Sequence, residues 1–348
     1  MRRRAIAYAL LSAALFGAST PLAKVLVGAM NPLSLAGVLY LGSGVGLTAW
    51  LVLRRVARHE HGAPLARADW PWLAGAIAAG GLAGPALLMY GLARTGAASA
   101  SLLLNLEAVL TAVLAWVVFR ENVDCRIFAG MVAIVAGGIL LSWESAPGAA
   151  SLAGPLLIAG ACAAWAVDNN LTRRVSGGDA VLIAAAKGLV AGVVNLGIAL
   201  AIGARLPAPA ALLLAGLIGL LGYGVSLVLF IMALRDLGTA RTGAYFSVAP
   251  FFGALLALSI FGAPASPAFW AAGALMAIGV WLHVTERHEH EHEHEPVTHA
   301  HEHVHDSHHA HDHDPAWNGA EPHTHVHRHP RLRHGHPHYP DLHHRHRH

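Results

Sequence analysis

The chain has 348 residues, of which 55% are hydrophobic and only 12% are charged, and its mean hydropathy is +0.50. A soluble domain carries about 25% charged residues, so this composition excludes an ordinary soluble protein and indicates an integral membrane protein surrounded by a lipid bilayer. The formal net charge of +3 is the sum of +8 over residues 1–287 and −5 over residues 288–348, which gives no support for nucleic-acid binding.

Apolar stretches long enough to cross a hydrocarbon layer of about 30 Å recur along the chain. We expect ten of them, at residues 5–27, 32–53, 71–92, 97–119, 124–143, 151–171, 180–203, 209–233, 239–262 and 267–284. No loop between them could hold a soluble domain. The predicted fold class is therefore an all-α integral membrane protein with ten transmembrane helices.

Arginine is distributed unevenly between the loops on the two sides of these spans. With the amino terminus inside, fourteen arginines fall in cytoplasmic segments, and only Arg94 and Arg205 fall on the opposite side. The positive-inside rule then predicts that both termini are cytoplasmic.

An internal repeat runs through the spans. A shift of 142 residues lays Gly80 on Gly222 and Phe119 on Phe261, and a shift of 149 lays Phe16 on Trp165. Two five-helix repeats follow, at residues 5–143 and 151–284. Because five is odd, the second repeat must cross the membrane in the opposite sense, as in secondary transporters that bind substrate at the repeat interface.

Polar residues inside the spans are the candidates for a substrate path. Residues spaced i, i+3, i+4 and i+7 share one helix face, and both opening helices carry such a set: Phe16, Ser19, Thr20 and Ala23, matched by Trp165, Asp168, Asn169 and Thr172. Tyr245, one turn before Pro250, is a further candidate aromatic. The alternative for all of them is helix packing, in which polar side chains bond across helices for about 0.6 kcal/mol each.

Ionisable groups inside the spans are costly in lipid and ask for a partner, a proton or water. Glu107 lies near the middle of its span, with Asn105 two residues earlier, and we expect it to lie on the path. Desolvation penalises its charged form, which suits a proton carrier; the alternative is a permanently protonated structural carboxyl. Asp168 and Lys187 lie at levels that would allow an ion pair, either structural or gating.

The residues from His288 onward form a histidine-rich tail that holds 23 of the 26 histidines. This polar, proline-containing segment at 288–348 has nothing to bury, so we expect it to be disordered. Its alternating imidazoles could bind Zn²⁺, Ni²⁺, Co²⁺ or Cu²⁺ loosely as a metal buffer or sensor; a pH-responsive polycation and a tail without a role are the alternatives. The candidate ligands are His288, His290, His292, His294, His299, His301, His303, His305, His308, His309, His311, His313, His323, His325, His327 and His329.

Several motifs taken in order resemble one known family. They are LFGASTPLAK, GGLAGPALLMYGL, SLLLNLEAVLTAVLAW, WAVDNNLTRRVSGGD, KGLVAG and GYGVSLVLFIMALRDLGTARTGAYFSVAP. Together they resemble the EamA-type transporters of the drug/metabolite transporter superfamily over residues 5–284. The resemblance implies ten helices in two inverted repeats, alternating access, and export or exchange of small metabolites across a bacterial inner membrane.

The leading hypothesis is a secondary active transporter, acting as an exporter of a small metabolite and requiring no cofactor. One rival makes the cargo a divalent metal ion or metal chelate gathered by the tail, and another makes the protein a membrane-tethered metal buffer or sensor. The oligomeric state stays open, with a homodimer as one option. No phosphate loop of the GxxxxGK(S/T) type and no HExxH motif supports an ATP-driven pump or an enzyme.

Overall fold

The computed structural model describes residues 2–58, 65–119, 125–144, 152–175, 178–237, 242, 245–262, 265–285, 289–294, 297–303, 323–329 and 332–337. The chain forms two compact units, Met1–Glu286 and Arg287–His348. The first unit consists of helices, and the second contains the strands.

The helical unit contains the following elements: α1 (Arg2–Val27), α2 (Pro32–Arg58), η1 (Arg67–Asp69), α3 (Trp70–Ala76), η2 (Ile77–Ala83), α4 (Gly84–Arg94), α5 (Ala97–Leu103), α6 (Leu106–Phe119), α7 (Cys125–Glu144), α8 (Ala153–Val175), α9 (Ala180–Ala201), α10 (Pro209–Gly219), η4 (Leu220–Val225), α11 (Ser226–Leu237), α13 (Ala249–Phe261) and α14 (Pro267–Val284). Here η1 is a 3₁₀ turn, and η2 and η4 are π-helical segments.

Local capping residues explain several helix ends. The Asp179 side chain accepts from the backbone N–H of Val181 at 2.9 Å and begins α9, and Ser266 accepts from the N–H of Phe269 at 3.0 Å and begins α14. Gly262 ends α13 with a positive φ of 58°, a conformation that glycine adopts without a Cβ penalty. The boundaries of these helices therefore follow from nearby residues.

The described helices overlap the expected spans, but not all of them are long and apolar enough to cross a membrane, and residues 239–241 and 243–244 of the ninth expected span lie outside the described residues. Seven helical stretches in the described part of the chain are long and apolar enough to cross a membrane. Two more apolar helices, Ala249–Phe261 and Pro267–Leu282, are shorter. The α8 helix is less apolar because Asp168 and two asparagines follow one another in it.

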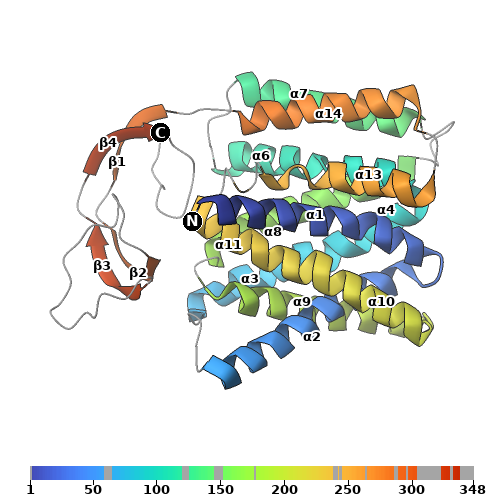
Figure 1. Ribbon diagram of the computed structural model, residues 1–348, viewed down its shortest axis with the longest axis horizontal. Coiled ribbons are helices and arrows are strands. Elements are labelled where there is room, and N and C mark those ends of the chain that lie inside the picture. The colour runs from blue at the N-terminus through green and yellow to red at the C-terminus, as the bar shows by residue number, and fades with distance from the viewer. Residues whose placement is uncertain are drawn as a thin grey trace. The chain divides into compact units, whose positions relative to one another are not determined.

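The two sequence halves do not form separate bundles, because helices of one half pack on helices of the other. The most extensive contacts join α2 to α9 and α7 to α14, which are equivalent helices of the two repeats (Figure 1). Likewise α1 packs on α11 and α13, while α8 packs on α4 and α6. The single compact unit is the result of this exchange of partners.

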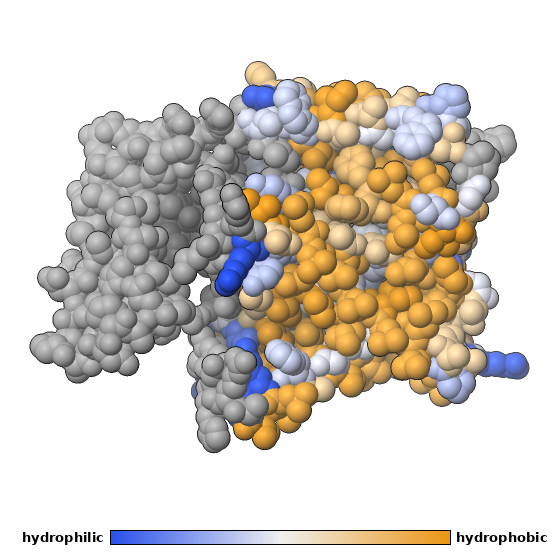
Figure 2. Space-filling view, viewed as in Figure 1, coloured by the Kyte–Doolittle hydropathy of each residue, from blue (hydrophilic) through white to orange (hydrophobic). Residues whose placement is uncertain are grey.

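Polar and apolar residues are placed as expected for a protein in lipid. The visible face of the helical unit is largely apolar, with the most hydrophilic residues near the helix ends (Figure 2). Large apolar side chains such as Val193, Leu213 and Ile139 are at least 60% exposed, whereas Asn105 and Asp168 are buried. The polar side chains whose transfer into lipid is unfavourable therefore lie inside the helical unit and not on its lipid-facing surface.

Four segments of the histidine-rich tail are strands, while the expectation that the tail as a whole is disordered stays a prediction. Strands β1 (Glu289–His294), β2 (Val297–His303), β3 (His323–His329) and β4 (Leu332–Pro337) form two antiparallel pairs, β1 with β4 and β2 with β3. Of the candidate ligands, six lie outside the described residues: His288, His305, His308, His309, His311 and His313.

Candidate functional site

The site is organised around two π-helical segments at equivalent points of the repeat. Segment η2 contains Gly80 and segment η4 contains Gly222, the pair that the shift of 142 residues superposes. A π-helical segment inside an α-helix frequently marks a functional site because its wider turn disturbs the regular backbone hydrogen bonds. The sequence repeat is thus also a repeat of an unusual backbone geometry.

The first of these segments offers two backbone carbonyls to side chains from other helices. The carbonyl of Gly80 accepts from the Tyr40 hydroxyl at 2.8 Å and from Trp165 Nε1 at 3.0 Å. The carbonyl of Gly81 accepts from Asn195 Nδ2 at 3.0 Å. Helices α2, α8 and α9 therefore all bind the disturbed turn of the third span.

Each π-helical segment also packs closely against the first helix of the other repeat: η2 against α8, and η4 against α1. A Cβ built on Gly80 would overlap the carboxylate of Asp168, and a Cβ built on Gly222 would lie 2.5 Å from the Cβ of Ser19. Ser19 and Asp168 are the residues that the shift of 149 superposes. Both repeats use glycine for the same close approach, but one approaching side chain is neutral and the other is charged.

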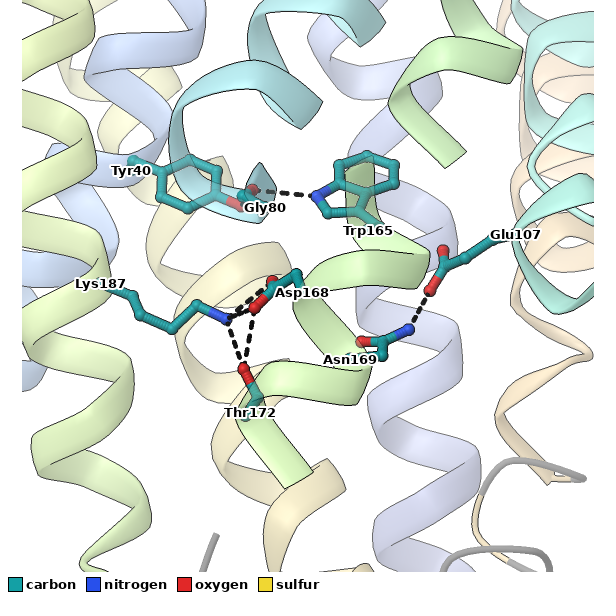
Figure 3. A network of polar contacts seen from close by, with 8 residues as sticks. All are labelled: Tyr40, Gly80, Glu107, Trp165, Asp168, Asn169, Thr172 and Lys187. Carbon is teal, nitrogen blue, oxygen red and sulfur yellow. Dashed lines mark hydrogen bonds and ion pairs between the residues drawn. The ribbon is translucent and has the colours of Figure 1, made fainter. Parts of the chain in front are cut away.

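Asp168 and Lys187 form a buried ion pair between α8 and α9. Lys187 Nζ lies 2.6 Å from Oδ1 and 2.7 Å from Oδ2 of Asp168, and 3.2 Å from the Thr172 hydroxyl, which itself donates to Asp168 Oδ1 at 2.8 Å (Figure 3). Asp168 is 6% and Lys187 5% exposed. The attraction within a buried ion pair offsets the free-energy cost of desolvating both charges only when their remaining hydrogen bonds are satisfied. Thr172 contributes one such hydrogen bond here.

Glu107 lies on the other side of α8 from Lys187 and accepts a hydrogen bond from Asn169 (Figure 3). Asn169 Nδ2 donates to Glu107 Oε1 at 2.7 Å, with Asn169 exposed and Glu107 partly buried (Figure 3). Glu107 occupies the first turn of α6, where the helix dipole favours a negative charge. The carboxylate therefore has a partner although no lysine or arginine was expected at its level.

The fourth span is not one continuous helix as expected, because it breaks between α5 and α6 at Leu104 and Asn105. The Asn105 side chain donates to the Leu102 carbonyl at 2.9 Å and also lies 3.7 Å from Met276 Sδ. Asparagine competes for backbone groups in this way and interrupts helices. The ninth span turns at Ser247 and Val248, just before α13, and Ser247 is the repeat equivalent of Asn105.

Aromatic rings fill the space between the two π-helical segments. The Phe16 ring centroid lies 5.9 Å from that of Trp165, 5.9 Å from that of Tyr223 and 5.4 Å from that of Phe246. Tyr40 and Tyr223 are 5.2 Å apart. Phe16 thus links the opening helices of both repeats.

Sequence reasoning missed Tyr40, Asn195, Tyr223 and Phe246. Tyr223 directly follows the matched Gly222, which was the available signal, whereas Tyr40 and Asn195 stand in plain apolar helices. Phe246 contacts Phe16, but its neighbour Tyr245 packs on a separate cluster that includes Ala5 and Ala9. Thr20 lies one helical turn after Phe16 on α1 and is buried. Among the described side chains of residues 2–285, no three histidine, cysteine or acidic groups gather to hold a metal ion.

About ten helices in the described part of the chain, seven of them long and apolar enough to cross a membrane, pack in one unit with a polar centre and broken helices, which is the architecture of a multi-pass membrane carrier. The model of the EamA-like transporter family, part of the drug/metabolite transporter superfamily, matches residues 3–143 and 152–285. The chain therefore belongs to the EamA-like transporter family, and it is a transporter and not an enzyme.

The proteins to which the chain is similar include a transporter and a solved structure. An uncharacterized transporter from Methanothermobacter thermautotrophicus (strain Delta H) is 28% identical over 284 residues, covering 77% of this chain and 82% of the relative. A crystal structure of a protein aligns with a TM-score of 0.61 at 20% identity, covering 81% of this chain and 98% of that one. The second similarity concerns the fold alone.

Proposed function

We propose that the protein is a secondary active transporter that exports a small organic metabolite by alternating access. The two repeats are inverted, both termini are cytoplasmic, and the path runs between the repeats past Trp165 and Asp168. Glu107 is the site that exchanges protons. The uneven distribution of arginines between the two sides supports this orientation.

The observation that carries the proposal is the Glu107–Asn169 pair at the break of the fourth span. Asn169 is exposed although Glu107 lies near the middle of its span, and a charged group at that depth must face water or protein because lipid solvates it poorly. Broken helices are tolerated in membranes where they line such a path. The equivalent turn in the ninth span supports the participation of both repeats.

A growth screen tests this function. Cells that overproduce the full chain are challenged with metals, amino acids and toxic metabolite analogues, and efflux of any solute to which they become resistant is then measured in loaded vesicles. Trp165→Ala and Asp168→Ala should abolish the resistance. The matched controls are Trp143→Ala, whose side chain is 81% exposed, and Asp69→Ala in the short η1 turn. Equal resistance in all four variants would contradict the proposal.

A second candidate cargo is a divalent metal ion or its chelate. The register of β2 and β3 pairs His299 with His327, His301 with His325 and His303 with His323, so six histidine positions share one face of that ladder. Directly opposed positions have Cβ atoms about 4.5–5.5 Å apart, a spacing at which two imidazoles can share one ion.

Deletion of residues 288–348 distinguishes the candidate functions. Loss of metal tolerance favours the metal cargo, whereas unchanged metal tolerance together with unchanged resistance to an organic solute favours the metabolite exporter. If the deletion abolishes metal resistance and Trp165→Ala has no effect on any solute, the helices serve only to anchor a metal buffer or sensor.

A further inference from the structure

Lys24 of α1 binds the end of α4. Its Nζ donates to the backbone carbonyl of Thr95 at 2.9 Å and also to the carbonyl of Leu92. The last four carbonyls of a helix have no partner within the helix, so a basic side chain at that end is favoured both as a hydrogen-bond donor and by the helix dipole. These two hydrogen bonds connect the end of α1 that lies far from the amino terminus to the corner between α4 and α5.

The helices around the polar centre form two groups. Helix α1 packs on α11 and α13, which we call the α1 group, and α8 packs on α4 and α6, which we call the α8 group. Each group thus combines the opening helix of one repeat with later helices of the other. The break in the fourth span divides that span between them, because α5 packs mainly on α13 whereas α6 packs mainly on α8. Lys24 therefore forms hydrogen bonds from one group to the other.

At the end that holds Lys24, helix α5 lies between the groups and contacts both. On the side of the α1 group, a Cβ built on Gly253 of α13 would lie 2.9 Å from Ser101 Oγ. On the side of the α8 group, Cys162 Sγ donates to the Leu103 carbonyl at 3.8 Å. The side chains of Ser101, Leu103 and Cys162 are all buried. The two groups are therefore closed against each other at this end.

The groups are less closely joined at the other end, toward the amino terminus. Within the described residues, α6 packs on α8 and α7 and has no comparable contact with α1, α11 or α13. Asn169 of α8 is exposed and Glu107 of α6 is only partly buried, although they hydrogen-bond to each other (Figure 3). The first turns of α1 instead form a separate apolar cluster with α11, through Ala5, Ala9 and Ala233.

We infer that this conformation is open toward the amino terminus and that Lys24 is a gating residue that holds the opposite end closed. Opening of that end must separate α1 from the end of α4, so both hydrogen bonds of Lys24 must break. The inference rests on the proposed alternating access and adds a residue that sets the balance between its two conformations. Lys24 acts by positioning the helices and not by contact with the solute.

Labelling of single cysteines with a membrane-impermeant maleimide measures which end is open. The full chain, with Cys125 and Cys162 replaced by alanine, carries one of two reporters, Ser101→Cys or Asn169→Cys. Inside-out vesicles present the face of the predicted cytoplasmic termini to the reagent, and right-side-out vesicles present the other face. We expect fast labelling of Asn169→Cys in the first and slow labelling of Ser101→Cys in the second.

Lys24→Met removes the donor and keeps an unbranched side chain. It should speed the labelling of Ser101→Cys about tenfold, which corresponds to about 1.4 kcal/mol, the scale of one hydrogen bond from a charged group. It should also slow the labelling of Asn169→Cys, because one conformation gains the population that the other loses. The matched control is Arg94→Met, since Arg94 donates to the Tyr90 carbonyl at 2.9 Å within α4 and should affect neither rate.

Three results would overturn the gating role of Lys24: an unchanged rate for Ser101→Cys in Lys24→Met, faster labelling of both reporters, which indicates a loosened fold, or an equal effect of Arg94→Met. Slow labelling of Asn169→Cys with Lys24 in place would overturn the open end. Failure of the proposed function is seen separately, because labelling needs no solute, whereas a protein that transports nothing changes no resistance in the growth screen.

Discussion

Asp168 and Asn169 are neighbours on α8, yet they bind different helices: Asp168 pairs with Lys187 of α9 and Asn169 with Glu107 of α6. Consecutive residues point about 100° apart around a helix, so α8 connects two polar contacts that do not touch each other. A movement of α8 would change both contacts at once. This coupling is the basis of the first two predictions.

The buried ion pair should show a strong double-mutant effect. Asp168→Asn or Lys187→Met alone leaves one buried charge without its partner and should cost about 3–5 kcal/mol of unfolding free energy. The double variant Asp168→Asn/Lys187→Met should cost clearly less than the sum of the two. Denaturant unfolding of the full chain in micelles measures all three, and additive losses would show that the pair is not coupled.

Substitution of the central carboxyl should remove the pH dependence of transport. Glutamine in Glu107→Gln can still accept the hydrogen bond from Asn169 but cannot bind or release a proton at neutral pH. We expect flux that no longer responds to a pH gradient, with an unchanged unfolding transition. The check is solute flux in proteoliposomes at several imposed gradients, with Asp69→Asn as the control. Unchanged pH-driven flux would remove Glu107 as the proton carrier.

The two π-helical glycines should tolerate no side chain. Gly222→Ala should destabilise the protein because the new methyl group would lie 2.5 Å from the Ser19 Cβ, and Ser19→Gly in the same chain should restore part of the loss. Gly80→Ala should be worse, because it displaces the carboxylate that holds Lys187.

The matched control for these substitutions is Gly197→Ala in α9, where nothing lies within 4 Å of the added Cβ. Alanine should stabilise that helix by up to about 1 kcal/mol. Thermal unfolding compares the variants. Equal effects at positions 197 and 222 would refute the close approach.

Asp179 has two roles that substitution can separate. Its Oδ1 caps α9, and its Oδ2 pairs with Arg54, whose side chain is 23% exposed. Asp179→Asn keeps a capping oxygen and should cost less than about 1 kcal/mol, since partly exposed ion pairs contribute little. Asp179→Ala also removes the cap and should cost about 1–2 kcal/mol more. Urea or thermal unfolding gives both values; similar losses would mean that the cap is unimportant.

The sequence by itself determined the class of the protein, the position of the helices and the internal repeat. Hydrophobic run length reports directly on the bilayer, and the match of Gly80 with Gly222 survives because both halves need a glycine at the same close contact. The resemblance to the EamA-type transporters rests on sequence motifs that include Gly80 and Gly222. The family match over residues 3–143 and 152–285 likewise depends on no side-chain geometry.

Only the tertiary structure decided which polar residues have partners. Asn169 reaches Glu107 across 62 positions of sequence, and Trp165 reaches the Gly80 carbonyl because helices of opposite repeats pack on each other. Helix breaks and π-helical segments depend on a few local hydrogen bonds that hydropathy does not record, so the sequence predicts one unbroken span at residues 97–119. Contacts between distant helices are set by packing, and packing is not a periodic property of the chain.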